Sequence, residues 1–132
     1  MRTKTRTKSG RRTSGRPGPA AERKATILKA LAHPTRVIIF EALAEGELTA
    51  GDISRLLGAK ESITSRHLAV MKAAGLVAAR KEGLKVYYSN KMPCLLSIFP
   101  CLDQAVCVMA DEQGRIAASI RHPRLSSGRR CD

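Results

Sequence analysis

The sequence predicts a mostly helical domain with one small β-hairpin, in the arrangement of a winged helix-turn-helix. Between residues 25 and 75, short stretches with apolar residues at helical spacing follow one another and are separated by proline and glycine. Directly after them, the segment LVAARKEGLKVYYSN alternates apolar and polar residues around a glycine turn. A compact set of short helices followed at once by a basic hairpin is typical of a DNA-binding winged helix.

Most of the positive charge lies at the two ends of the chain. The 132 residues carry a net charge of +13, of which residues 1–24 contribute +8 and residues 115–132 contribute +4. A charge of this sign suggests a nucleic-acid partner, and the length supports one domain with its own core. We expect a disordered basic arm over residues 1–22, the winged-helix domain over residues 23–114 and a basic, partly disordered tail over residues 115–132.

The sequence indicates a cytoplasmic protein. Its four cysteines lack the regular spread of a disulfide-stapled domain, which fits a reducing compartment. Its start, MRTKTRTKSGRRTSGRPGPA, has no apolar segment that would serve as a signal peptide. No apolar run approaches the roughly 18 residues needed to span a bilayer, so we expect no membrane partner.

Two helices are expected first. Ile27, Leu28 and Leu31 mark one apolar helical face. Pro34 then interrupts and restarts the helix, because proline fits a first turn but disfavours helical backbone in the residue before it. A second apolar helix follows, and Gly46 ends it.

Two more helices are expected to form the helix-turn-helix. Thr49 is a suitable N-cap for a short third helix, which Gly58 closes. The segment KESITSRHLAVMKAAGLV then carries apolar residues at helical spacing and ends at Gly75. We expect this fourth helix to be the recognition helix.

A hairpin and one last helix complete the predicted domain. Glu82 and Gly83 provide the turn of the hairpin. Asn90 is a plausible N-cap for a long helix that runs to about Gln113. Pro100 falls inside this helix, where it removes an N–H group and crowds the preceding turn, so we expect a kink or two separate helices.

Two stretches of the sequence resemble the ArsR/SmtB family of bacterial winged-helix repressors: they read LKALAHPTRVIIFEAL and DISRLLGAKESITSRHLAVMKAAGLVAARKEGLKVYYS. The joint presence of LAHPTR, the S-x-T-S-x-H-L run and AAGLV followed by an EG wing makes the resemblance specific. It implies a homodimer built on the first and last helices, which binds an imperfect palindrome in double-stranded operator DNA. It also implies that an inducer releases the repressor from this DNA.

The expected DNA face comprises the start of the fourth helix and the wing. The first turns of a recognition helix usually reach base edges in the major groove, where Arg66 is suited to guanine. His67 is equally consistent with packing beside Leu68. Cations on a wing contact phosphate without choosing a sequence, although a solvated run of charge is the alternative. The candidate DNA-binding residues are Ser62, Thr64, Ser65, Arg66, His67, Lys72, Arg80, Lys81 and Lys85.

Two sensor sites of the resembled family are missing. Members with an arsenite site on the third helix carry a C-V-C pair in a segment such as ELCVCDL, whereas this chain has ELTAGDI, with Thr49 and Gly51 at the thiolate positions. Members that bind zinc between the last helices use an Asp and a His two residues apart. Here the residue two positions after Asp103 is Ala105 and not a histidine, and His122 lies beyond the expected last helix. We therefore expect neither site.

Three cysteines on the expected last helix remain as a candidate inducer or metal site: Cys94, Cys101 and Cys107. On an ideal helix, Cys94 and Cys101 share a face within about 20° but stand about 10.5 Å apart along the axis. This separation exceeds the limit of roughly 7 Å between disulfide-bonded Cα atoms, so a straight helix cannot bridge them. A break at Pro100, or the partner helix of a dimer, would bring the thiols together.

The chemistry of these thiols favours a thiophilic inducer: trivalent arsenic or antimony, or a soft metal ion. No obligatory cofactor is indicated. The same thiols also suit a sensor of reactive sulfur or oxidant, although the family's persulfide sensors pair a last-helix cysteine with one on the second helix, where VIIFEALAE has none. Packing is the remaining interpretation, because free cysteine often behaves as a small buried hydrophobe.

Two other classes of protein are alternatives to a repressor. A constitutive or architectural DNA-binding protein would owe its affinity to the basic ends, so removal of residues 1–24 would abolish binding. An enzyme is not indicated, because the sequence has no carboxylate pair, Cys-His arrangement or phosphate-binding glycine loop.

Overall fold

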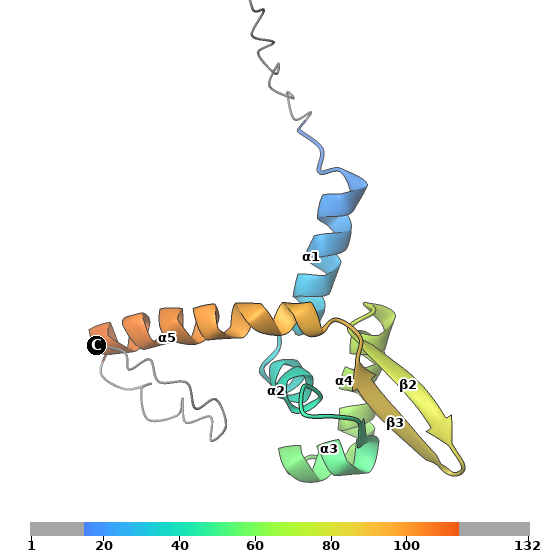
Figure 1. Cartoon of the computed structure of the whole chain (residues 1–132). Helices are drawn as coiled ribbons and strands as arrows, with labels where there is room; N and C mark the ends of the chain where they lie inside the picture. The colour runs from blue at the N-terminus through green and yellow to red at the C-terminus, as the bar shows by residue number, and fades with distance from the viewer. Residues whose placement is uncertain (1–14, 114–132) are drawn as a thin grey trace, which may run out of the picture.

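A computed structural model describes residues 15–113 and confirms the mostly helical fold with a small antiparallel sheet. In chain order the elements are α1 (Pro19–Leu31), α2 (Pro34–Ala42), β1 (Leu48–Thr49), α3 (Ala50–Leu57), α4 (Glu61–Ala73), β2 (Val77–Glu82), β3 (Lys85–Asn90), the 3₁₀ helix η1 (Pro93–Ile98) and α5 (Phe99–Gln113) (Figure 1).

The first helix begins earlier than the sequence predicts. Pro19 opens α1, so residues 19–22 of the expected basic arm are helical. Proline suits this position because the first helical N–H has no partner within the helix and the fixed φ of the ring already matches the helix. The structure does not describe residues 1–14 of the expected arm or the expected tail over residues 115–132.

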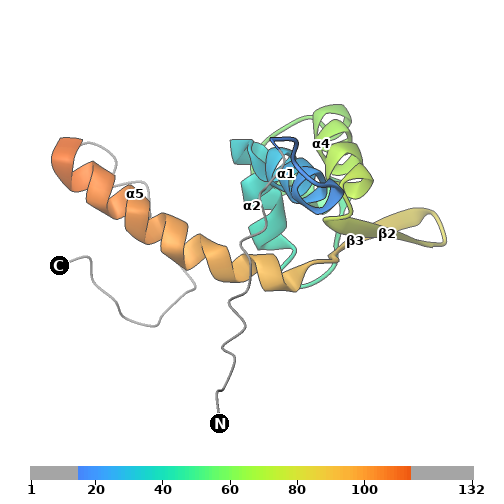
Figure 2. The same ribbon diagram turned by 90° about the horizontal axis from the view of Figure 1, so that it is seen from above.

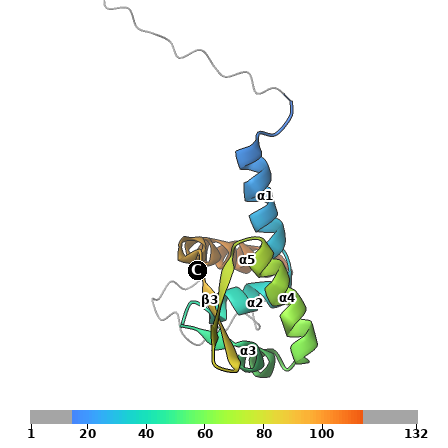
Figure 3. The same ribbon diagram turned by 90° about the vertical axis from the view of Figure 1, so that its right-hand side faces the viewer.

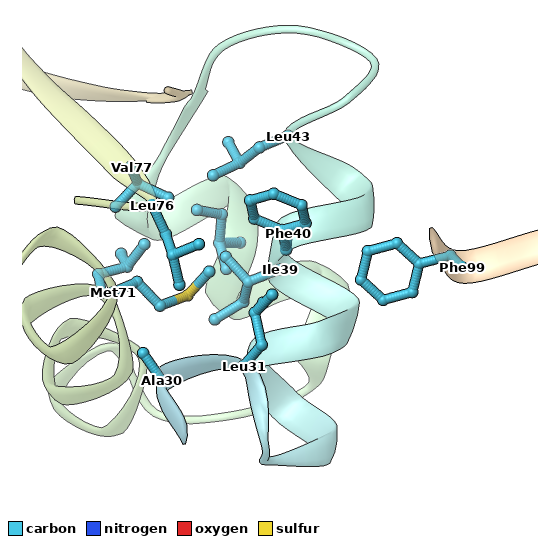
Figure 4. Close-up of a cluster of buried hydrophobic side chains, with 11 residues drawn as sticks. Ala30, Leu31, Ile39, Phe40, Leu43, Met71, Leu76, Val77 and Phe99 are labelled. Atoms are coloured by element: carbon cyan, nitrogen blue, oxygen red, sulfur yellow. The ribbon is translucent and has the colours of Figure 1, made fainter. Parts of the chain in front are cut away.

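The core lies where α2, α3 and α4 meet the start of the sheet. Its largest fully buried side chains include Ile39 and Phe40 of α2 and Leu68 and Met71 of α4. Figure 4 shows Phe99 approaching Phe40 from α5, and the two ring centroids are 5.9 Å apart. Phe99 is therefore the side chain that fixes the start of α5 to the helical body.

The predicted helix boundaries are confirmed where local chemistry decides them. The Nδ1 atom of His33 accepts a hydrogen bond from the backbone N–H of Thr35 at 3.1 Å, which caps α2 just before Pro34. Thr49 and Asp52 form a reciprocal capping box at the start of α3. Gly58 ends α3 with a φ of +61°, a left-handed conformation that favours glycine.

The sheet has the strand order β1-β3-β2, and both pairs of strands are antiparallel. Strands β2 and β3 form the predicted hairpin, which we call the wing. Its turn is made by Gly83 and Leu84, because Glu82 is already paired with Lys85 as the last rung of the ladder. Gly83 has a φ of +60°. Only glycines have a positive φ in the part of the chain that the structure describes, so the φ of Leu84 is negative. A glycine at the first central position alone is the pattern of a type II′ turn.

The last predicted helix is two helices. The structure has a 3₁₀ segment over Pro93–Ile98 and an α-helix from Phe99, so Pro100 lies in the first turn of α5, where its missing N–H costs nothing. Asn90 is not the N-cap of this helix. It is the last residue of β3, and its Oδ1 atom accepts the backbone N–H of Met92 at 2.8 Å.

The sequence predicts no segment of membrane-spanning length, and this prediction is wrong, because one helical stretch is long and apolar enough to cross a bilayer. Pro93–Ala110 forms an 18-residue stretch with a mean hydropathy of 1.6, and only 11% of it is buried. Figures 1 and 2 show α5 leading away from the helical body, which leaves this apolar stretch largely uncovered. Helices that pack on another protein pass the same test of length and hydropathy, so the finding alone indicates an uncovered apolar surface.

Candidate DNA interface

The first turns of α4 present the polar side chains expected to meet DNA. Ser62, Ser65 and Arg66 are exposed, and so is Lys72 near the end of the helix. Figure 3 shows α3 and the turn of the wing at the same end of the molecule, opposite the start of α1. Glu61 and Ser65 of α4 line one groove with Lys85 of the wing, so the start of α4 lies beside the wing.

Thr64 corrects the predicted set, because its side chain is fully buried. Its Oγ1 atom lies 2.9 Å from the Oγ of Ser54 in α3, and the carbonyl of Lys60 accepts from it at 3.4 Å. A side chain buried between α3 and α4 cannot contact DNA. The signal was present in the sequence, since Thr64 precedes the buried Leu68 by four residues and so lies on the same helical face.

His67 lies at the edge of this face and contacts another histidine. Its ring centroid is 4.6 Å from that of His33, the residue that caps α2. Burial, with the nearby His33 and Arg36, lowers the pKa of His67 below its ordinary value, which favours the neutral ring. The two histidines join the recognition helix to the junction between α1 and α2, which supports the packing interpretation of His67.

Arg80 of the wing is engaged by carboxylates. Its Nη2 atom lies 2.7 Å from Oε2 of Glu47, and its Nη1 atom lies 2.5 Å from Oε2 of Glu82. The guanidinium also lies 5.1 Å from the ring centroid of Tyr87, its partner across the hairpin. The hydrogen bond that Arg80 donates to Glu47 lowers the pKa of Glu47. The hydrogen bonds that Arg80 donates to Glu47 and Glu82 raise the pKa of Arg80.

The sequence prediction missed Glu47, which lies in the turn before β1. Alternation along β2 puts Arg80 and Glu82 on one face of the wing and Lys81 on the other, with the buried Val77. Arg80 thus points to the face away from the core. The pairing with Glu47 depends on how β1 meets β3, and no local pattern in the sequence indicates that contact.

Lys81 and Lys85 are exposed and form no ion pair with the residues that the structure describes. Lys85 lines a groove of about 490 Å³ between the wing and the starts of α3 and α4, which we call the wing groove. Ser65 of the recognition helix lines the same groove. Its lining is completed by Thr49, Ala50, Gly51, Asp52, Arg55, Glu61, Leu84, Val86, Tyr87 and Tyr88.

The charge of the wing groove is close to balanced at the start of α3. Hydrogen bonds from Thr49 hold the pKa of Asp52 below its ordinary value, and the charges of Arg55 and Lys85 add to this effect. The Arg55 guanidinium lies 2.5 Å from the Asp52 carboxylate. Asp52 is therefore ionised and committed to the capping box, while Lys85 remains available to an anion that enters the groove.

Cys94, Cys101 and Cys107 are free cysteines in the structure. Cys94 lies in η1 and Cys101 in α5, so the two residues do not belong to one continuous α-helix. On ideal coaxial helices of these two types they would stand about 13 Å apart along the axis and about 80° apart around it. Among the residues that the structure describes, no three His, Cys, Asp or Glu side chains could hold a metal ion.

None of the three cysteines belongs to the buried core of the part of the chain that the structure describes. Cys94 and Cys101 are exposed, and Cys107 is half-buried. Their apolar neighbours differ, because Phe99 is buried and Leu95, Leu96 and Ile98 pack against the core, whereas Leu102 is 51% exposed. The exposed thiols are accessible to small thiophilic molecules and to a second protein.

Comparison with known proteins gives one consistent result. Residues 33–79 match the family described as bacterial regulatory protein, arsR family. The HTH-type transcriptional regulator YgaV of Escherichia coli is 35% identical over 89 residues, which span 67% of this chain and 90% of that protein. A biofilm growth-associated repressor of Agrobacterium fabrum is 37% identical over 76 residues, or 54% of this chain and 65% of that protein.

A solved structure shares the fold. The homodimeric winged helix-turn-helix DNA-binding domain of Mb0332 from Mycobacterium bovis, a possible ArsR-family transcriptional regulator, aligns with a TM-score of 0.57 at 32% identity. The alignment covers 76% of this chain and 92% of that one. The winged helix-turn-helix predicted from the sequence is therefore confirmed.

Proposed function

Because the chain belongs to the ArsR family of bacterial transcriptional repressors, we propose that it binds operator DNA as a homodimer and leaves it when an inducer reacts with last-helix thiols. Since operator DNA lies in the cytoplasm of a bacterium, the proposal places the protein there. The observation that carries DNA binding is the wing groove, which has Ser65 of α4 on one side and Lys85 of the wing on the other.

In the proposed complex, the exposed residues of α4 read the major groove. Arg66 is suited to a bidentate contact with guanine, and Ser62 and Ser65 are suited to phosphate or base edges. Lys72, Lys81 and Lys85 neutralise phosphates, which gives affinity that falls with salt. Thr64 has no direct role, because the structure buries it.

The homodimer is supported by the uncovered face of α5. Val106, Val108 and Met109 are 37%, 60% and 65% exposed, and Leu28 of α1 is 54% exposed. Apolar surface of this kind along two helices is typical of a protein interface. A twofold dimer would also present two recognition helices to the two halves of a palindrome.

The thiol sensor is proposed to be completed across the dimer. Cys94 and Cys101 lie in the segment that carries the uncovered apolar face, and no group of ligands forms within the described part of one chain. Trivalent arsenic and soft metals prefer two or three thiolates. If thiols of the two subunits meet only in one subunit spacing, the inducer stabilises that spacing and so changes operator affinity.

The test measures DNA binding with and without arsenite. A duplex selected by the wild-type protein from a randomised library serves as the probe, and fluorescence anisotropy gives Kd. We expect arsenite to weaken binding by the wild type and by Cys131→Ser, the matched control, but not by Cys94→Ser or Cys101→Ser. Cys107→Ser reports whether the third thiol takes part. Release that persists in all three last-helix variants would exclude this site.

The exposure of Cys94 and Cys101 favours a second candidate, a sensor of oxidant or reactive sulfur. Accessible thiols react by forming a disulfide or polysulfide link, which a reductant reverses. Treatment with hydrogen peroxide or inorganic polysulfide should then release the duplex and dithiothreitol should restore binding, with no effect of arsenite. Non-reducing gel electrophoresis would show whether the link joins two chains.

A further inference from the structure

Ile63 is an exposed apolar side chain in the first turn of α4, the helix proposed to read DNA. Its relative exposure is 46%, whereas Leu68 and Met71 of the same helix are fully buried. In the described part of the chain, Ile63 belongs neither to the core nor to the apolar side chains that pack on the core. Single exposed apolar residues are common on protein surfaces, so the position of Ile63 decides what it contacts.

The spacing of residues along α4 places Ile63 beside Arg66. Successive residues of an α-helix are about 100° apart, so Ile63 and Arg66 lie about 60° apart around the axis and one turn from each other along it. Ser62 and Arg66 are about 40° apart, and all three side chains are exposed. Ile63 is therefore an apolar member of the face that presents the polar side chains proposed to contact bases.

The charge on this flank of α4 suits DNA. Glu61 lies about 160° from Ile63 around the helix and lines the wing groove instead. His67 lies about 40° from Ile63, and burial lowers its pKa, which favours the neutral ring. Arg66 forms no ion pair with any residue that the structure describes. The flank that carries Ile63 thus presents neutral and positive groups, and the acidic residue of the first turn lies on the opposite flank.

An isoleucine that enters the major groove has one favourable neighbour there. Most base edges in this groove carry hydrogen-bond donors and acceptors, which lose their water against an apolar side chain and gain no new bond. Thymine differs, because its C5-methyl group projects into the major groove and is itself apolar. Contact with Ile63 therefore favours thymine over the other three bases at the position that the side chain faces.

We propose that Ile63 is a specificity-determining residue, which selects thymine beside the base read by Arg66 through contact with the C5-methyl group. The inference rests on the proposed function, because it requires that the first turns of α4 enter the major groove of operator DNA. An apolar partner protein is the other class of occupant for this surface. The isolation of Ile63 does not favour it, since Val70, the other exposed large apolar side chain of α4, stands about 10.5 Å farther along the axis.

The experiment removes apolar atoms from either side of the contact. Kd is measured by fluorescence anisotropy for the duplex selected by wild type, and for duplexes in which one thymine of a half-site at a time is replaced by deoxyuridine, which lacks the methyl group. We expect one of these replacements to weaken binding by wild type about fourfold, as for the loss of one buried methyl group. Ile63→Ala should bind the thymine duplex more weakly than wild type and should reduce the effect of that replacement to less than about twofold.

Val70→Ala is the matched control, because it shortens the other exposed large apolar side chain of the same helix, two turns beyond the first. It should keep the wild-type Kd and the wild-type preference for thymine over deoxyuridine. Equal thermal melting of wild type and the two variants confirms that neither substitution unfolds the helix.

The possible failures overturn different statements. If wild type selects a duplex whose half-sites contain no thymine, or if Ile63→Ala keeps the full preference for thymine over deoxyuridine, the role of Ile63 is refuted and the repressor remains. If Ile63→Ala keeps that preference but changes the oligomeric state in light scattering, Ile63 belongs to a protein interface instead. If wild type selects no duplex from the library, the proposed function itself is refuted.

Discussion

Thr64 and Ser65 are adjacent in α4 but face opposite sides of it. Thr64 is buried beside Ser54, whereas Ser65 is exposed in the wing groove. We predict that Thr64→Val, which keeps the shape but removes the hydroxyl partner of Ser54, lowers the free energy of unfolding by about 1 kcal/mol. Its Kd for DNA should change less than about threefold, because the hydroxyl pair lies away from the duplex.

Ser65→Ala is the matched control and should show the reverse pattern. It should leave the free energy of unfolding within about 0.5 kcal/mol of wild type and weaken DNA binding instead. Urea denaturation and fluorescence anisotropy measure the two quantities. Equal effects of both variants on Kd would contradict the assignment of Thr64 to the interior.

The lowered pKa of His67 predicts how the free energy of unfolding depends on pH. Burial lowers its pKa below the ordinary value of 6.5, so the unfolded chain binds a proton at a higher pH than the folded chain does. The contribution of His67 to stability is therefore complete above pH 6.5 and is lost as the pH falls from 6.5 through the lower pKa of the folded state. Urea denaturation of wild type between pH 7.5 and about 5 should show this decline.

The variant His67→Gln removes the titrating ring and should flatten that part of the pH profile. Its stability at pH 7.5 should be lower than that of wild type, because the contact with His33 is lost. A pH profile identical to that of wild type would assign the acid sensitivity to other groups.

At the scale of the elements, the wing is held to the turn before β1 by Arg80 and Glu47. We predict that Arg80 positions the wing and does not contact phosphate. Arg80→Gln and Glu47→Gln should then each weaken DNA binding about threefold, the range of an exposed ion pair, with an unchanged salt slope. A phosphate contact would give the opposite result for Glu47→Gln, since its loss would release the guanidinium to DNA and tighten binding.

The elements also show which features are predictable from sequence. The N-cap at Thr49, the break at Pro34 and the end of α3 at Gly58 are predictable, because each depends on a few adjacent residues. The sequence predicts Asn90 as an N-cap, which is wrong. Its position in β3 depends on pairing with Val77, thirteen residues away, and local preference for an N-cap is outweighed by the sheet.

In the candidate DNA interface, too, some features are predictable from the sequence and others are not. Periodicity identified α4 and the wing, and most of their predicted polar residues are exposed. The burial of Thr64 and the pairing of Arg80 follow from packing between elements, which periodicity within one element does not contain.

At the scale of the whole molecule, α5 is held to the body at Phe99 and exposes apolar residues beyond it. If this face forms the dimer, a charge there should separate the subunits. We predict that Val106→Glu is a monomer by light scattering at concentrations where wild type is a dimer, because a buried, unpaired carboxylate is costly. Leu56→Glu, a charge on an exposed leucine of α3, should remain dimeric.

The same variant should lose affinity for a palindrome far more than for half of it. In a dimer, binding of one half-site raises the effective concentration of the second recognition helix, so avidity exceeds the affinity of either domain by about 100-fold or more. Val106→Glu should therefore bind the full site about 100-fold more weakly than wild type and bind the half-site equally. If Val106→Glu binds the full site as tightly as wild type does, α5 is not the dimer interface, and the sensor proposed across it falls too.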